Sequence, residues 1–156
     1  MPRWLRWYAL AAAVLGLDYV SKVVVLHSFA PGERLAVAPF FNLVLVFNTG
    51  AAFSFLATAQ GWQTFFFAAI AVVASLVIGF LILRNAGKAL FCSGLALILG
   101  GALGNLYDRL VYGHVVDFLD LHAAGWHWPA FNVADSAITV GAAILIVESF
   151  FPKRSG

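Results

Sequence analysis

Four apolar runs, each long enough to cross a lipid bilayer, constrain the fold more than any other feature of this sequence. The runs cover residues 7–26, 62–83, 89–107 and 131–151. A helix of about 20 residues spans the roughly 30 Å of hydrocarbon in a bilayer. Because that hydrocarbon offers no hydrogen-bond partners, a chain crosses it as a helix or as part of a closed barrel. Runs of this length predict four transmembrane helices.

The composition supports the same conclusion. Of the 156 residues, 63% are hydrophobic and 10% are charged, whereas about a quarter of the residues in a soluble domain are charged. The length suits one domain. We therefore expect an all-α membrane protein with a single domain over residues 1–156.

Residues 27–60, between the first two runs, have a different pattern. Turn-forming residues begin the segment, and residues 40–47 are β-branched and aromatic, which is typical of a strand. Asn48 and Gly50 follow; the glycine permits a close backbone approach, although a plain hairpin turn would have the same residues. We expect a small sheet on the membrane surface between helices 1 and 2, with its apolar face toward lipid or substrate.

The basic residues predict the orientation of the helices, because cytoplasmic segments carry an excess of Lys and Arg. If both termini are cytoplasmic, the inner side holds Arg3, Arg6, Arg84, Lys88, Lys153 and Arg154, and the outer side holds Arg34 and Arg109, with Lys22 near its edge. We therefore expect cytoplasmic termini and an external end of the third run.

Polar residues gather where the third run ends and the fourth begins. Asn105, Asp108 and Arg109 follow one another at the end of the third run, and Asp117 comes after a short gap. Asp135 lies about one turn inside the fourth run. Two carboxylates thus bracket one loop at the outer mouth of two apolar segments.

A pair of carboxyl groups in a place of low dielectric has a definite chemistry. Both groups cannot ionise cheaply, so they share a proton and their pKa values separate. The ionised partner can activate water while the protonated partner donates to a carbonyl oxygen. This is aspartic peptidase chemistry, which needs neither a metal nor a cofactor.

Other interpretations of these acids stay open on the residues alone. Asn132 and Asp135 have the spacing of a helix N-cap followed by an acid, which stabilises the start of a helix. Asp120 competes with Asp117, because residues 115–121 form an apolar stretch that carries both acids and shows no decisive periodicity.

Two charged pairs allow a structural or a functional interpretation. Asp18 and Lys22 lie in the first run at the i,i+4 spacing that puts them on one helix face. Charged residues inside a span usually face the protein interior, as a structural ion pair or as the support of an active site. Asp108 and Arg109 could form a simple pair at the membrane edge.

The sequence argues against a metal site and a nucleic-acid partner. The single cysteine, Cys92, lies in an apolar run, and the four histidines lack the HExxH spacing. Basic residues are scattered singly or in pairs rather than in a stripe. We expect no metal, no cofactor and no nucleic acid.

Four motifs carry a resemblance to a known family. In chain order they are Asp18-x-x-Ser21-Lys22; Asn48-Thr49-Gly50-Ala51-Ala52-Phe53; Gly101-x-x-Gly104-Asn105-x-x-Asp108-Arg109 with Gly113-x-Val115-Val116-Asp117-Phe118; and Phe131-Asn132-x-Ala134-Asp135-Ser136. With these motifs the sequence resembles the lipoprotein signal peptidases, the type II signal peptidases of bacteria.

The resemblance implies an aspartic endopeptidase whose catalytic pair is Asp117 and Asp135, which selects Asp117 over Asp120. It also implies that further polar residues bind substrate or support the site, namely Asn48, Gly50, Asn105, Asp108, Arg109, Asn132, Asp18 and Lys22. The segment after the first helix would be a periplasmic β-cradle, and residues 113–128 would be a mobile gate over the pair.

The implied substrate is a prolipoprotein whose cysteine already carries diacylglycerol. The cut falls just before that cysteine, at the periplasmic face of the bacterial inner membrane, and releases the signal peptide. Inhibition by globomycin-type compounds belongs to the same expectation. We expect a monomer embedded in membrane lipid.

Two other classes of function remain as alternatives. A transporter or channel could use Asp18, Lys22 and Asp135 as a proton or ion path, although no inverted repeat supports it. A non-catalytic membrane adaptor would hold a partner on its surface sheet, and it would keep its function when both acids were changed.

Overall fold

The computed structural model describes residues 2–50 and 62–150. The helices of this part are α1 (Leu5–Ser28), α2 (Trp62–Arg84), α3 (Ala89–Tyr112) and α4 (Val133–Phe150). Its strands are β1 (Arg34–Ala38), β2 (Phe41–Asn48), β3 (Val115–Ala123) and β4 (Trp126–His127). Each of the helices is long and apolar enough to cross a membrane. The expected fold class, four transmembrane helices with a small sheet, is confirmed. Two parts of the predictions, the motif residues 51–53 and the end of the fourth span at residue 151, lie outside the described residues.

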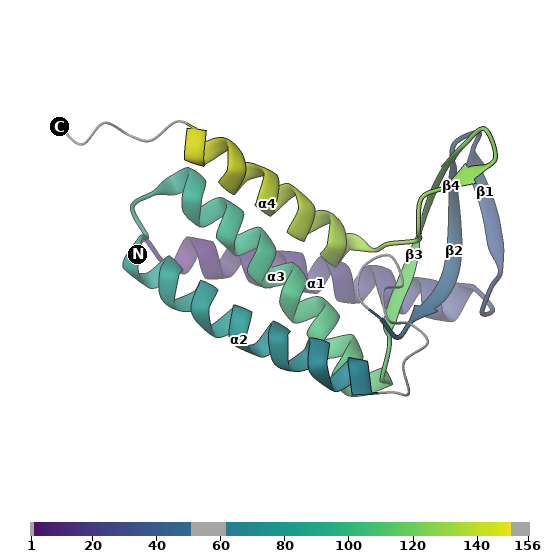
Figure 1. Ribbon diagram of the computed structural model, residues 1–156, viewed down its shortest axis with the longest axis horizontal. Helices are drawn as coiled ribbons and strands as arrows, with labels where there is room; N and C mark the ends of the chain where they lie inside the picture. Colours follow the sequence, from purple (N-terminus) through teal and green to yellow (C-terminus); the bar gives the residue numbers. More distant parts are fainter. Residues whose placement is uncertain (1, 51–61, 151–156) are drawn as a thin grey trace.

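The helices lie side by side, with α3 packed against each of the other three (Figure 1). In the most apolar stretch of α3, 50% of the residues are buried, against 22% or less in the other helices. The beginning of α1 and the end of α4 lie at one end of the bundle, and the sheet lies at the other (Figure 1).

Glycines on α3 allow close packing against the neighbouring helices. A Cβ atom at Gly100 would lie 2.6 Å from the carbonyl oxygen of Ala11 in α1, and a Cβ atom at Gly104 would overlap the carboxylate of Asp18. Small residues let helix backbones approach in this way. The approach brings polar side chains of α1 within reach of α3.

Helix α3 continues past its predicted end at residue 107 and includes Asp108 and Arg109. The charges do not end the helix, because both side chains have hydrogen-bonding partners within the protein. The helix ends at Tyr112, and the next residue, Gly113, has a φ of 76°. That left-handed conformation is the common way to terminate a helix.

The strands form one antiparallel sheet in the order β1-β2-β3-β4. The sequence indicates a strand at residues 40–47 but not β3, which follows α3 and pairs with β2. Because β3 is buried on both faces over most of its length, it lacks the alternation that marks a half-buried strand. The mobility of residues 113–128 stays a prediction.

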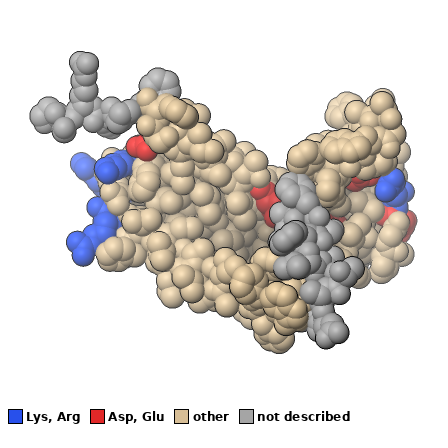
Figure 2. Space-filling view, viewed as in Figure 1, with Lys and Arg blue, Asp and Glu red and all other residues tan. Residues whose placement is uncertain are grey.

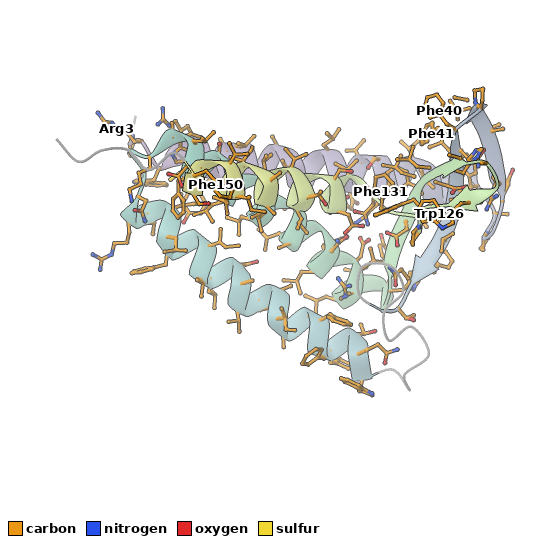
Figure 3. All side chains as sticks on the ribbon, turned by 45° about the horizontal axis from the view of Figure 1, so that its top comes forward. Arg3, Phe40, Phe41, Trp126, Phe131 and Phe150 are labelled. Carbon is orange, nitrogen blue, oxygen red and sulfur yellow. The ribbon has the colours of Figure 1, made fainter. Side chains whose placement is uncertain are left out.

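Apolar contacts and backbone bonds fasten β3 to the helices. Val116 and Phe118 pack with Val25 of α1 in a buried cluster. Phe131, just before α4, lies close to the sheet (Figure 3), and its carbonyl oxygen accepts a hydrogen bond of 3.0 Å from the N–H of Phe118. The start of α4 is therefore held against β3, which brings residues from both into one site.

Candidate active site

Asp117 and Asp135 meet where β3 approaches the first turn of α4. Asp117 lies in the middle of β3 and is 2% exposed. Asp135 is in the first turn of α4. The side chain of Asn132 lies between them: its Nδ2 donates to Asp117 Oδ1 at 2.8 Å, and its Oδ1 accepts from the N–H of Asp135 at 2.9 Å. The structure thus brings together the two acids that the sequence places at the mouth of the apolar runs.

The N-cap interpretation of Asn132 and Asp135 is also correct. Besides accepting the N–H of Asp135, Asn132 donates its own N–H to Asp135 Oδ2 at 3.3 Å. This reciprocal pair is a capping box, in which each side chain accepts a backbone N–H that the helix start leaves unpaired. The cap and the site use the same two residues, so one interpretation does not exclude the other.

Amide groups surround both carboxyls. Asn48, at the end of β2, donates from Nδ2 to Asp117 Oδ2 at 3.0 Å. Asn105, on α3, donates from Nδ2 to Asp135 Oδ1 at 2.8 Å. With Asn132, three asparagines from three segments direct N–H donors at the pair.

A buried ion cluster lies behind these amides. The Lys22 ammonium is 2.7 Å from Asp18 Oδ2 and 2.8 Å from Asp108 Oδ2, and it donates to Asn105 Oδ1 at 3.1 Å. Asp18 Oδ1 also accepts the N–H of Ala134 at 2.8 Å. The cluster therefore joins α1 and α3 to the start of α4, and the predicted Asp18–Lys22 ion pair is present.

Asp108 and Arg109 do not form the simple membrane-edge pair that the sequence allowed. Asp108 is 2% exposed, and its Oδ2 accepts the N–H of Val116 at 3.0 Å in addition to the contact with Lys22. Arg109 turns the other way and donates from Nη2 to the carbonyl oxygen of Gly50 at 3.0 Å. Asp108 therefore anchors β3 to α3, and Arg109 holds the backbone at Gly50, next to the site.

The surroundings of Asp117 change its acidity. Burial raises the pKa of its carboxyl to about 7, and the nearby charge of Asp135 acts in the same direction. Hydrogen bonds from Asn48 and Asn132 oppose this change because they favour the charged form. A carboxyl with this pKa can hold or release its proton near neutral pH.

Asp120 has different partners. It lies three positions along β3 from Asp117, and side chains alternate between the two faces of a strand. Asn42 Nδ2 and His127 Nδ1 each lie 2.8 Å from its carboxylate, and Arg34 lies 3.6 Å away. Burial, the largest single effect, would raise the pKa of Asp120, but the hydrogen bonds from Asn42 and His127 and the nearby charges of Arg34 and His127 together lower it. The structure therefore separates the two acids that the sequence left in competition.

An apolar cavity of about 640 Å³ opens beside the pair. Polar groups of Asn48, Asn105, Arg109 and Asp135 line one part of it. Apolar side chains from α2, α3, α4 and the sheet line the rest, among them Phe67, Ile70, Ala102, Phe131 and Ile138. Figure 2 shows a hollow between the helices and the sheet, with acidic side chains at its edge. The cavity suits an apolar segment with a polar backbone at one point.

Within residues 2–50 and 62–150, no three His, Cys, Asp or Glu side chains are grouped so as to hold a metal ion. Four apolar helices and a carboxyl pair, of which Asp117 is buried and Asp135 lines an apolar cavity, define a membrane protein equipped for aspartic peptidase chemistry.

Comparisons with known proteins identify the family. The family model described as signal peptidase (SPase) II matches residues 10–151. The chain is 56% identical over 142 residues to a lipoprotein signal peptidase of Paraburkholderia phymatum, covering 91% of this chain and 86% of that one. It is 54% identical over 144 residues to that of a Janthinobacterium species, covering 92% and 87%. A solved bacterial membrane enzyme superposes with a TM-score of 0.84 at 28% identity, covering 97% of this chain and 93% of that one. The chain therefore belongs to the signal peptidase II family.

Proposed function

We propose that Asp117 and Asp135 are the catalytic pair with which this signal peptidase II, an aspartic peptidase, removes signal peptides from prolipoproteins. The observation that carries the assignment is the single asparagine, Asn132, that contacts both acids through 2.8 and 2.9 Å hydrogen bonds. Its side chain binds the carboxyl of Asp117, and its backbone N–H binds the carboxyl of Asp135, which lines an apolar cavity.

The reaction needs one ionised and one protonated carboxyl. The ionised carboxylate removes a proton from water, and the water oxygen attacks the carbonyl carbon of the scissile bond. The protonated carboxyl gives its proton to the carbonyl oxygen. The first carboxyl then gives the proton that it took from water to the leaving nitrogen, the second carboxylate takes back a hydroxyl proton from the tetrahedral intermediate, and the carbonyl re-forms as the C–N bond breaks. A pKa of about 7 for Asp117 makes both protonation states accessible.

The remaining polar residues have positioning roles in this proposal. Asn48, Asn105 and Asn132 hold the carboxyls, and Arg109 fixes the backbone at Gly50. Asp18, Lys22 and Asp108 form the ion cluster that supports Asn105 and the start of α4.

The proposed substrate is a prolipoprotein whose cysteine carries diacylglycerol, cut just before that cysteine. The apolar cavity accommodates its signal segment, because apolar side chains form most of the lining. The amides and Arg109 can satisfy the peptide groups of the substrate at membrane depth. Globomycin-type inhibitors would occupy the same cavity. We further propose that the enzyme acts as a monomer within membrane lipid and that residues 1–156 form one domain.

The proposed location is the bacterial inner membrane, with both termini in the cytoplasm and the site at the periplasmic face. Basic side chains gather at the end of the bundle away from the sheet (Figure 2). Such an excess of Lys and Arg marks the cytoplasmic side. The sequence places Arg109 on the outer side and Lys22 near its edge. Both side chains bind groups within the protein, so they do not weaken the excess of basic residues on the cytoplasmic side.

Cleavage of a diacylglyceryl-modified prolipoprotein by purified protein in detergent tests the proposal. Asp117→Asn and Asp135→Asn should each lower turnover by about 10³-fold or more, since each removes one of the two proton-transfer groups. Asp120→Asn, on the same strand, is the matched control and should remain active. Turnover that survived in either of the first two variants, with folding intact, would overturn the assignment. Ion flux through reconstituted protein would then support the transport alternative.

A further inference from the structure

A second cavity of about 540 Å³ lies between the first turns of α2 and the end of α3. The start of α2 and the end of α3 are neighbours at the sheet end of the bundle (Figure 1). Among the described residues its lining consists of Thr49, Gln63, Thr64, Phe65, Ala68, Arg109, Leu110 and Gly113. Of these residues, only Arg109 has a role in the site described above.

The two cavities adjoin at Arg109 and the end of β2. Arg109 lines both, and the consecutive residues Asn48 and Thr49 line the first and the second. Asn48 also donates to Asp117. A chain that left the first cavity past Asn48, which binds Asp117, would therefore enter the second.

The second cavity contains a buried acceptor and a buried donor that lack partners. Gln63 is 2% exposed, and its Oε1 has no hydrogen-bond partner among the described residues. The Nε of Arg109 is likewise buried and unpaired within residues 2–50 and 62–150. Unpaired polar atoms are uncommon in protein interiors because each loses its bonds to water without replacement. Both atoms belong to residues that line this cavity, so a ligand there can supply the missing hydrogen bonds.

The combination of one acceptor and one donor selects the kind of ligand. A peptide group offers an N–H for Gln63 and a carbonyl oxygen for Arg109. The ester groups of diacylglycerol offer only acceptors and would leave Gln63 Oε1 unpaired. The sequence pattern does not mark Gln63 as functional; the available signal is a lone amide at the start of an apolar run.

We propose that this second cavity binds the backbone of the substrate on the far side of the cleavage site, the first residues of the mature lipoprotein. The inference rests on the proposed function and adds a second binding region to it. The signal segment lies in the larger apolar cavity, the scissile bond lies at the carboxyl pair, and the backbone after the cut pairs with Gln63 and Arg109.

A coupling experiment on purified enzyme tests this assignment. The substrates are diacylglyceryl peptides with one signal segment and an unchanged scissile amide. The backbone amide N–H of the second, third or fourth residue after the cleavage site is removed in turn by replacing that amide with an ester. The enzymes are wild type, Gln63→Leu, which keeps the size but removes the amide, and Ser75→Ala. Ser75 is the matched control, because it is on the same helix, has an unpaired buried hydroxyl and lines neither cavity.

One ester position should lower kcat/KM for the wild type by about fivefold to tenfold, the effect of one hydrogen bond. Gln63→Leu should lower kcat/KM for the all-amide substrate by a similar factor, chiefly through KM, and the same ester should then have little further effect. Ser75→Ala should behave as wild type does. Competition by a signal segment that ends at the cleavage site should be unchanged in Gln63→Leu, because that segment occupies the other cavity.

The result that would overturn the inference is an ester effect of equal size in wild type and Gln63→Leu at every position, or unchanged kcat/KM in Gln63→Leu. Melting temperatures of both variants show whether a loss of activity reflects unfolding. Weaker binding of a lipidated mature-side peptide to Gln63→Leu that is still folded would show that the loss comes from the binding region and not from unfolding. Failure of the proposed function would look different, since wild type itself would then not cleave the all-amide substrate.

Discussion

Lys22 compensates two buried carboxylates at once, so its loss should destabilise the protein strongly. Its ammonium is 2.7 Å from Asp18 and 2.8 Å from Asp108, and all three side chains are 3% exposed or less. Lys22→Met keeps most of the volume and removes the charge. Two acids then remain buried without a cation, and breaking a buried pair in this way costs about 3–5 kcal/mol.

The measurement is reversible unfolding of the purified protein in mixed micelles, followed by helix content as denaturing detergent is added. Lys22→Met should lower the free energy of unfolding by about 3–5 kcal/mol. The variant Lys22→Met/Asp18→Asn/Asp108→Asn should recover part of that loss, because it also removes the two uncompensated charges. Each new asparagine keeps an oxygen that can accept the N–H of Ala134 or Val116.

Two outcomes would refute this reasoning. Lys22→Met could unfold at the same detergent fraction as wild type, which would mean that the carboxylates do not need the cation. Alternatively, the triple variant could be less stable than the single one, which would mean that the loss comes from packing and not from charge. Both outcomes are read from the same titration.

Two further predictions concern acidity and packing. Burial raises the pKa of Asp117 from its usual 3.8 to about 7, so between these pH values the folded state binds more protons than the unfolded state, and stability falls as the pH rises. Asp117→Asn should therefore weaken the pH dependence of the melting temperature between about pH 4 and 7. An unchanged pH dependence would contradict the assigned pKa. A methyl group at Gly104 would overlap Asp18, whereas Gly16 has open space around its Cβ position. Gly104→Ala should therefore lower the free energy of unfolding by about 1–3 kcal/mol in the same titration, and Gly16→Ala should not lower it. Equal stabilities of the two variants would contradict the packing argument.

The helices could be predicted from the sequence because a bilayer requires long apolar runs. Asp135 could also be predicted as a candidate, because charged residues inside such runs are rare and usually face the protein interior. Local pattern could not choose between Asp117 and Asp120, since β3 is buried on both faces and shows no period of two. The pairing of Lys22 with Asp108 could not be predicted from local pattern either, because it joins two helices that are far apart in the chain.

The amide orientations at the site follow from chemistry rather than from shape. An ammonium group and a backbone N–H can only donate hydrogen bonds, so the atom that each contacts on an asparagine must be Oδ1. The Lys22 ammonium contacts Asn105, which turns Nδ2 of Asn105 toward Asp135. The N–H of Asp135 contacts Asn132, which turns Nδ2 of Asn132 away from the helix and toward Asp117.

The third asparagine obeys the same rule. The N–H of Gly50 donates to Asn48 Oδ1 at 2.9 Å, so Nδ2 of Asn48 faces Asp117 as well. Arg109 holds Gly50 by its carbonyl oxygen, so the orientation of Asn48 depends on a residue of α3. Each donor stabilises the ionised form of a carboxyl, whereas burial stabilises the protonated form. The two effects oppose each other, and the neighbouring groups hold the donors in these orientations. A pKa near 7 at Asp117 therefore requires the whole set of neighbours and not any one of them.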